Sequence, residues 1–228
     1  MESLWPVVGA ILPQALAIAL SPVPMICIVL VLLSPRPVRA GMSFAAGWVG
    51  ALAIAVGLVA WLTDTVAEDN GEAARDGVDL VQLGVGVLFA VLAVKYWRRR
   101  PSPGEPPPRP AVVDRIVTMS APALVLTGAA AVVANVKNLP LVLSAGSYIG
   151  GAGLGPGSVV GAAAVFVTTA SLSVLLPLLA VVVIGAEKSA RTLRSLEEWL
   201  LANLNTITVV LLVVLAAVMI GNGLDLFR

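Results

Sequence analysis

The chain has 228 residues, of which 59% are hydrophobic and only 12% carry a charge. It contains no His and one Cys, Cys27, so its own residues cannot form a disulfide, a Cys/His metal site or a His general base. A glycine-rich phosphate loop is absent as well, and the formal net charge of +1 does not indicate a nucleic-acid partner. The composition predicts a membrane protein that is not an enzyme and has no cofactor.

Apolar runs of roughly 20 residues, the length that a helix needs to cross a bilayer, recur along the chain. No Lys or Arg precedes the first run, which therefore lacks the basic segment of a secretory signal and is expected to stay in the mature protein. We predict an all-α membrane protein with six transmembrane helices at residues 7–33, 42–62, 79–97, 120–149, 158–184 and 206–223.

The first predicted span has a polar and proline-rich interruption near its middle, where Ser21, Pro22 and Pro24 separate two apolar runs. Proline removes a backbone donor and clashes with the preceding turn, so we expect the helix to kink or break here. The freed backbone groups then need protein partners or a wet cavity inside the membrane. A packing kink with a satisfied serine is the alternative.

The connection between the third and fourth spans, "RRRPSPGEPPPRPAVVDR", is rich in proline and charge. Such a composition cannot form a packed element, so we predict a cytoplasmic linker over residues 98–118. A ligand for a proline-binding module is the alternative interpretation. The linker divides the chain into two halves of three spans each, residues 1–97 and 119–228.

The fourth span repeats the pattern of the first, because an apolar lead is followed by a polar interruption and a second apolar run. The interruption consists of Asn135, Lys137, Asn138 and Pro140. Two halves with an odd number of spans must have opposite orientations, which predicts two inverted three-helix repeats. In transporters built this way, paired helix breaks in corresponding positions mark the binding site.

Lys137 lies far from both ends of the predicted fourth span. An ammonium group in lipid costs about 2.5 to 3.5 kcal/mol, so this side chain should face the protein interior and have a partner. No carboxylate lies in the interior of any predicted span. The partner is then either a carbonyl freed by a helix break or an anionic ligand, which the N-terminus of a restarting helix would also favour.

Further polar residues extend the candidate substrate-binding set along the fourth and fifth spans. Ser144 and Tyr148 share a helical stripe with Lys137, and Thr168 and Thr169 begin a hydroxyl cluster that includes Ser171 and Ser173. Such hydroxyls also bond commonly to carbonyls or adjacent helices. The glycine pairs 146/150 and 157/161 have the spacing of close helix packing.

An amphipathic segment over residues 187–204 precedes the last span. Leu193, Leu196, Leu200 and Leu204 share one face, with Trp199 beside it. This segment is predicted to lie along the cytoplasmic interface. It either contacts anionic lipid or anchors the last span as a connector.

Basic residues concentrate in the connections after the first, third and fifth spans, at 36–39, 95–115 and 188–194, whereas the connection at 64–79 is mainly acidic. The positive-inside rule therefore places the basic connections in the cytoplasm. Both termini are then predicted to lie outside a bacterial inner membrane.

Three stretches carry a family resemblance: "LSPVPMICIVLVLLSPRP" in the first span, "LGVGVLFAVLAVKYW" in the third and "NVKNLPL" in the fourth. Together with the six-span layout they resemble the GAP family of actinobacterial glycolipid or sulfolipid addressing proteins, in the lysine exporter superfamily. The resemblance implies a role in moving cell-envelope glycolipids to the surface.

We therefore expect a transporter that exports or flips an anionic envelope lipid, with its headgroup bound near mid-membrane. The spans offer too few polar groups to enclose a hydrophilic solute, whereas apolar walls suit acyl chains. An exporter of an amino acid or ion and a scaffold for lipid assembly are the alternatives. Expected partners are membrane lipids, with a second copy of the chain and envelope-lipid biosynthesis or export proteins as further candidates. A proton-driven cycle would have to use Lys137; otherwise transport is uncoupled or coupled through the substrate's charge.

Overall fold

A computed structural model describes residues 4–67, 71–98, 113–116, 118–135 and 137–224. Every regular element in this part of the chain is a helix, which confirms the predicted all-α class. The helices are α1 (Leu4–Ala19), α2 (Pro22–Leu32), α3 (Pro37–Ala67), α4 (Gly71–Arg98), α5 (Val113–Ile116), α6 (Ala121–Val133), α7 (Asn138–Gly150), α8 (Pro156–Ala170), α9 (Leu172–Ile184) and α10 (Ala186–Gly223).

Two helices are long and apolar enough to cross a membrane alone, over Pro37–Thr65 of α3 and Ala186–Gly221 of α10. Three helix pairs pass the same test as bent spans: α1–α2 at 56°, α6–α7 at 76° and α8–α9 at 68°. The described residues thus contain up to five candidate spans, compatible with a multi-pass membrane protein. The third predicted span, 79–97, lies in α4 and is not among the candidates found in the described residues.

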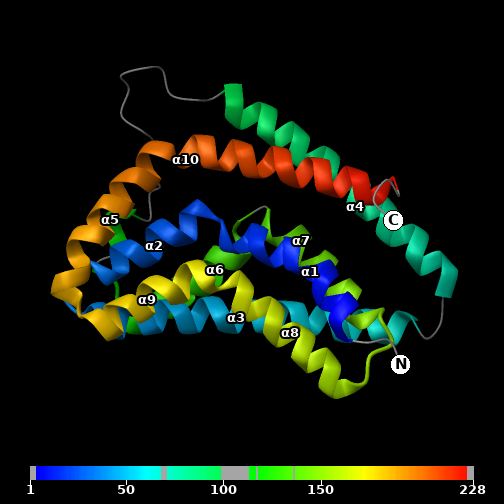
Figure 1. Ribbon diagram of the computed structural model, residues 1–228, viewed down its shortest axis with the longest axis horizontal. Helices are drawn as coiled ribbons and strands as arrows, with labels where there is room; N and C mark the ends of the chain where they lie inside the picture. The colour runs from blue at the N-terminus through cyan, green and yellow to red at the C-terminus, as the bar shows by residue number, and fades with distance from the viewer. Residues whose placement is uncertain (1–3, 68–70, 99–112, 117, 136, 225–228) are drawn as a thin grey trace.

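The helices run back and forth between two ends of an elongated bundle (Figure 1). The end on the left of Figure 1 holds α5 and the α2–α3 and α9–α10 connections, and we call it the basic end. Helix α4 packs along α10, α3 packs along α6 and α7, and α1 and α2 pack against α8 and α9 respectively. Most of the predicted linker lies outside the described residues, so the domain division stays a prediction.

Large hydrophobic side chains occur both in the interior of the bundle and on its outer surface. Trp48, Phe44 and Phe166 are fully buried, whereas Trp61 and Ile54 on α3 are more than half exposed. Large hydrophobic side chains that face outward are typical of a surface that contacts lipid.

Glycines on α3 and α6 bring these two helices into backbone contact. A Cβ atom added at Gly47 would lie 1.9 Å from the Val125 carbonyl oxygen, and one at Gly128 would lie 2.2 Å from the Phe44 carbonyl oxygen. No other residue type fits at such distances, because real Cβ atoms do not approach so closely. Small residues at helix crossings allow this close approach in membranes.

The predicted glycine pairs behave differently from each other. Gly146 and Gly150 of α7 contact α3, since a Cβ at Gly150 would lie 2.2 Å from the Ala60 carbonyl oxygen. In contrast, a Cβ at Gly157 would meet nothing within 4 Å, and one at Gly161 would meet only Leu4, at 3.8 Å. Close packing is therefore confirmed at the first pair and wrong at the second.

The predicted interfacial segment is the first part of α10, continuous with the predicted last span. In Figure 1 it curves around the basic end, and α10 packs against α2 and α9. Leu193 and Leu200 are buried, whereas Trp199 is exposed. The leucine face thus packs against protein, as expected for a connector that anchors the last span.

Candidate functional site

The first helix break follows from proline chemistry. Pro22 and Pro24 stand in the first turn of α2, and Ser21 before them adopts extended backbone angles of φ −69° and ψ 116°. The Ser21 N–H donates to the Ile18 carbonyl at 3.0 Å instead of the Ala17 carbonyl that a regular helix would use. The Ala17 carbonyl is therefore left without its helical donor.

The second break lies before Pro140, between the end of α6 and the start of α7. The Asn138 N–H donates to the Asn135 carbonyl at 2.8 Å, and α7 begins at Asn138. Pro140 is the third residue of α7, where its missing N–H has no helical partner to lose. Asn135 and Lys137 lie in the break and Asn138 begins α7, so Pro140 only limits how far α7 extends toward α6.

Two side-chain contacts join these breaks, which are far apart in sequence. The Lys137 Nζ atom donates to the Ala17 carbonyl oxygen at 2.6 Å, and the Ser21 hydroxyl donates to Asn138 Oδ1 at 3.4 Å. All three side chains are buried, with Lys137 only 6% exposed and the other two at 0%. We call Ala17, Ser21, Lys137 and Asn138 the junction.

The predicted partner of Lys137 is either a freed backbone carbonyl or an anionic ligand, and the structure shows the carbonyl. Its partner is a carbonyl freed by the first break, and a cation at a helix C-terminus is favoured by the helix dipole. No carboxylate pairs with Lys137 among the residues that the structure describes. The positive charge is thus held by backbone dipoles rather than by a counter-ion.

Hydrogen-bond donors outnumber acceptors at the junction. An ammonium has three donors, of which the Ala17 carbonyl takes one, and Asn138 Nδ2 is buried without an acceptor in the described structure. A buried polar group without a partner costs about 1 to 3 kcal/mol. The arrangement can accept a ligand that brings oxygen acceptors, and an oxyanion would also offset the charge.

The other predicted site residues divide into inward-facing and outward-facing groups. Pro22 and Pro24 are buried beside the junction. The Ser144 hydroxyl is buried and unpartnered among the described atoms, and Asn135 is half-buried. Thr169 is half-buried, whereas Tyr148 and Thr168 are exposed and do not face the interior.

A third break was missed from sequence. Helices α8 and α9 meet at Ser171 with a bend of 68°, although no proline stands there. Ser171 is fully buried, and neither its hydroxyl nor that of Ser173 has a partner within the described residues. The only sequence signal is the hydroxyl cluster of residues 168–173, which extends the candidate substrate-binding set and is not interpreted as a bend.

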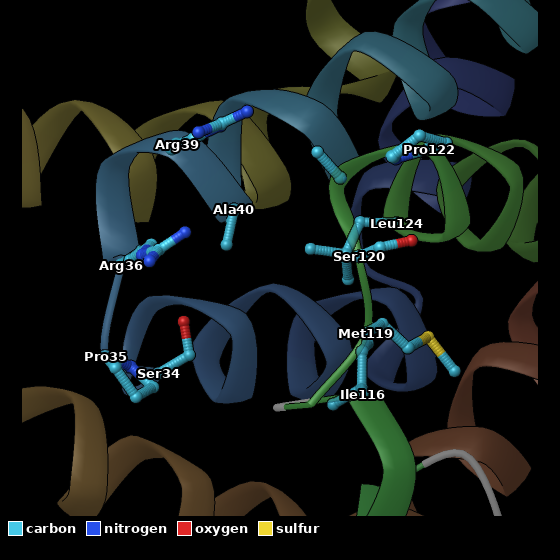
Figure 2. Close-up of a pocket in the computed structure, with 11 residues that line it drawn as sticks. Ser34, Pro35, Arg36, Arg39, Ala40, Ile116, Met119, Ser120, Pro122 and Leu124 are labelled. Carbon is cyan, nitrogen blue, oxygen red and sulfur yellow. The ribbon is translucent and has the colours of Figure 1, made fainter.

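A pocket of about 430 Å³ lies at the basic end, away from the junction. Figure 2 shows its walls, formed by the α2–α3 connection with Arg36, by the first turn of α3 with Arg39 and by the segment that leads into α6. Both α2 and α6 extend from this pocket to the junction. Since α2 has 11 residues, the two places are roughly 16 Å apart along its axis.

Comparison with known proteins identifies one family whose model matches the chain. No curated protein and no solved structure matches the chain. The family model described as Sap, sulfolipid-1-addressing protein, matches residues 11–225, which include both proline-marked breaks and the pocket. Because the match covers nearly the whole chain, this protein belongs to the Sap, sulfolipid-1-addressing protein family.

Proposed function

We propose that this protein is a transporter that moves a sulfated or similarly anionic lipid across the membrane, with the junction as its central binding site. The name of the family indicates a role in sulfolipid addressing or transport. The observation that carries the proposal is the buried, donor-rich junction of Ser21, Lys137 and Asn138 between two broken helices.

The chemistry of the junction suits one anionic group on an apolar molecule. A sulfate or phosphate ester offers several oxygen acceptors and a negative charge, which match the ammonium and the free Asn138 amide. Apart from a few buried polar side chains such as Gln14 and Ser171, the core of the bundle is hydrophobic, which suits acyl chains. Burial of Lys137 inside a membrane also favours a functional role, since intramembrane ionisable groups are costly to retain.

The arrangement of helices supports inverted repeats as the transport machinery. An exchange of the first three spans with the last three would pair α4 with α10, and would turn the α3 contact with α6–α7 into a contact of α8–α9 with α1–α2. Each of these packings occurs. The exchange is imperfect because α3 is straight, whereas its counterpart α8–α9 is bent at Ser171.

Transport by such halves would require the junction to open and close. In the closed form, Lys137 bonds to Ala17, and a headgroup oxyanion would compete with that carbonyl for the ammonium. Rocking of one half against the other would then present the headgroup to each side in turn. The ammonium either keeps its proton throughout, so that the substrate's charge drives coupling, or exchanges it once per cycle.

A scaffold for lipid assembly is the second candidate, and one observation favours it. The Ala17 carbonyl already gives Lys137 a partner, so a purely structural cap is chemically sufficient. A small-solute exporter is less well supported, because few polar groups line the junction. The two proposals differ in whether a lipid moves when the protein is purified and reconstituted.

The test is a lipid-flipping assay in vesicles of phosphatidylcholine. A fluorescent sulfatide and the matching uncharged galactosylceramide differ only in the sulfate, and an impermeant quencher reports their movement. We expect the wild-type protein to move the sulfatide faster, Lys137→Met to abolish that preference, and the exposed control Lys188→Met to retain it. Lys137→Arg should rescue only partly, because its planar fork replaces a compact ammonium.

Other outcomes would overturn the proposal. Movement of neither lipid by a folded and monodisperse protein would favour the scaffold, and equal movement of both would mean that flipping does not depend on the anionic headgroup. Movement of a labelled cationic amino acid alone would favour the small-solute exporter. Lys137→Met that remains folded and keeps the sulfatide preference would remove the junction from the site.

A further inference from the structure

The pocket at the basic end combines a positive rim with an apolar wall. Its polar lining consists of Ser34, Arg36, Arg39 and Ser120, and its apolar lining includes Met119 and Leu124. In Figure 2 the Arg36 side chain and the Ser34 hydroxyl both point into the space between the α2–α3 connection and the segment before α6. This pocket is separate from the junction.

The two arginines stand where helix electrostatics alone would not place them. Arg36 accepts the first helical hydrogen bond of α3, from the Ala40 N–H at 3.0 Å, and Arg39 lies in the first turn. The N-terminus of a helix is positive and normally attracts acidic side chains. The first turn of α3 has none, and neither guanidinium has a carboxylate partner in the described part of the chain.

The opposite wall adds a second positive helix end. Helix α6 has 13 residues and begins beside the pocket, with Ser120 at its N-cap in extended conformation. The Ser120 side chain makes no capping hydrogen bond, and the first turn of α6 contains no acid. The backbone donors of that turn therefore lack a side-chain acceptor. Two guanidinium groups and two helix N-termini thus give the pocket one sign of charge, with no acidic residue in its lining.

We propose that this pocket is a second binding site, which takes the sulfate or phosphate ester of a lipid in the adjacent leaflet before the lipid reaches the junction. Guanidinium groups bind such oxyanions through paired hydrogen bonds. The apolar wall at Met119 and Leu124 would contact the part of the lipid next to its headgroup. The proposal rests on the proposed lipid substrate, and it adds a place where the lipid is first captured.

The position of the pocket supports a path between the two sites. Helix α2 extends from the pocket at Ser34 to the junction at Ser21, and α6 begins at the pocket and ends before Lys137. A lipid headgroup that left the arginines would move along these two helices to reach the ammonium. The lipid would enter on the basic side, which the sequence predicts to be cytoplasmic.

The experiment measures equilibrium binding of sulfatide to the purified full chain in phosphatidylcholine nanodiscs, with galactosylceramide as the uncharged comparison. The test variant is Arg36→Gln/Arg39→Gln, which keeps side-chain length and polarity but removes both charges. The matched control is Arg191→Gln/Arg194→Gln, which removes two exposed charges at the same end on α10. Inorganic sulfate is added as a competitor to distinguish a lipid site from a free-anion site.

We expect the Arg36/Arg39 variant to lose at least tenfold in sulfatide affinity, with little change in galactosylceramide binding and little change in the control. Weak competition by inorganic sulfate would assign the site to the lipid, whereas full displacement at low sulfate concentration would assign it to a free anion and overturn the lipid proposal. Equal losses in both arginine variants would mean general surface attraction and would also overturn it.

The design separates failure of this inference from failure of the proposed function. If wild-type protein binds sulfatide and the Arg36/Arg39 variant binds it equally well, the arginines serve only to orient the chain, and the transporter proposal stands. If wild-type protein does not prefer sulfatide at all, both proposals fail. Lys137→Met should keep binding at the pocket while it loses flipping, which would show two distinct sites.

Discussion

The interface between α3 and α6–α7, which we call the seam, is built differently from the junction between the two helix breaks. At the seam, glycines bring backbone against backbone at Gly47, Gly128 and Gly150. At the junction, two hydrogen bonds join the broken helices and leave other polar atoms unpaired. The seam has one tight arrangement, whereas the junction can exchange its partners. From this difference we expect α3 to be the rigid support and α1–α2 to carry the movable contacts.

In the proposed inverted repeat, the interface between α8 and α1 is the counterpart of the seam. Helix α8 packs against α1, but Gly157 and Gly161 on α8 do not mediate backbone contact there. Packed cores switch between discrete arrangements rather than deforming smoothly, and the looser interface is the one that can switch. We therefore expect the α1–α2 and α8–α9 side to move relative to the α3–α6–α7 side.

The largest expected effect comes from filling the seam. Gly47→Ala places a Cβ atom 1.9 Å from the Val125 carbonyl oxygen, so α3 and α6 must separate. Overpacking of this kind costs about 1 to 3 kcal/mol or more, and backbone atoms cannot rotate away. Unfolding in mixed detergent micelles measures the loss. Gly50→Ala on the same helix is the control, because nothing lies within 4 Å of its added Cβ. Equal losses in both variants would contradict a backbone-tight seam.

Cross-linking offers a direct comparison between the two regions. Thr63 and Ser147 lie across the seam with their hydroxyl oxygens 3.4 Å apart, and the Ser21 hydroxyl is also 3.4 Å from Asn138 Oδ1. In a Cys27→Ser background, we expect a Ser21→Cys/Asn138→Cys disulfide to block the lipid movement that the same variant retains when it is reduced. A Thr63→Cys/Ser147→Cys disulfide should leave movement unchanged.

The cross-links distinguish a moving junction from a static one. If the oxidised junction pair still supports lipid movement, the junction does not open during transport. If the seam pair also blocks movement reversibly, α3 and α7 must move as well, and the division into rigid and movable sides is wrong. Non-reducing gel mobility after protease cleavage between the cysteines verifies that each disulfide has formed.

Sequence reasoning found the parts of this architecture that proline and charge determine locally. The breaks at Ser21 and Lys137 follow from residues that cannot continue a helix, and burial of Lys137 follows from the cost of charge in lipid. The bend at Ser171 has no proline and arises where α8 and α9 pack against α1 and α2, so no local signal predicted it.

The pocket escaped sequence reasoning for a different reason. Arg36 and Arg39 were interpreted only as markers of membrane orientation, because nothing near them in sequence suggests a binding wall. Met119 and Leu124, which line the same pocket, follow the linker in sequence and lie near the arginines only in the folded protein. Likewise, the predicted helical stripe of Lys137 and Tyr148 does not place both side chains at the site. Helix α7 begins at Asn138, and the Tyr148 side chain on it is exposed.

The smallest expected change in stability comes from making the junction apolar. Ser21→Ala/Asn138→Leu removes one weak hydrogen bond and also the unpaired Asn138 amide. Replacement of both partners by apolar groups is often neutral or stabilising, so the free energy of unfolding should stay within about 1 kcal/mol of the wild type.

Sulfatide movement should nevertheless fall about tenfold, equivalent to roughly 1.4 kcal/mol, because the headgroup loses an amide donor. Natural sites keep such unfavourable polar atoms when function requires them. A variant that is destabilised by several kcal/mol would instead mark Ser21 and Asn138 as structural, and a variant with unchanged flipping would leave Lys137 as the only junction side chain that the lipid needs.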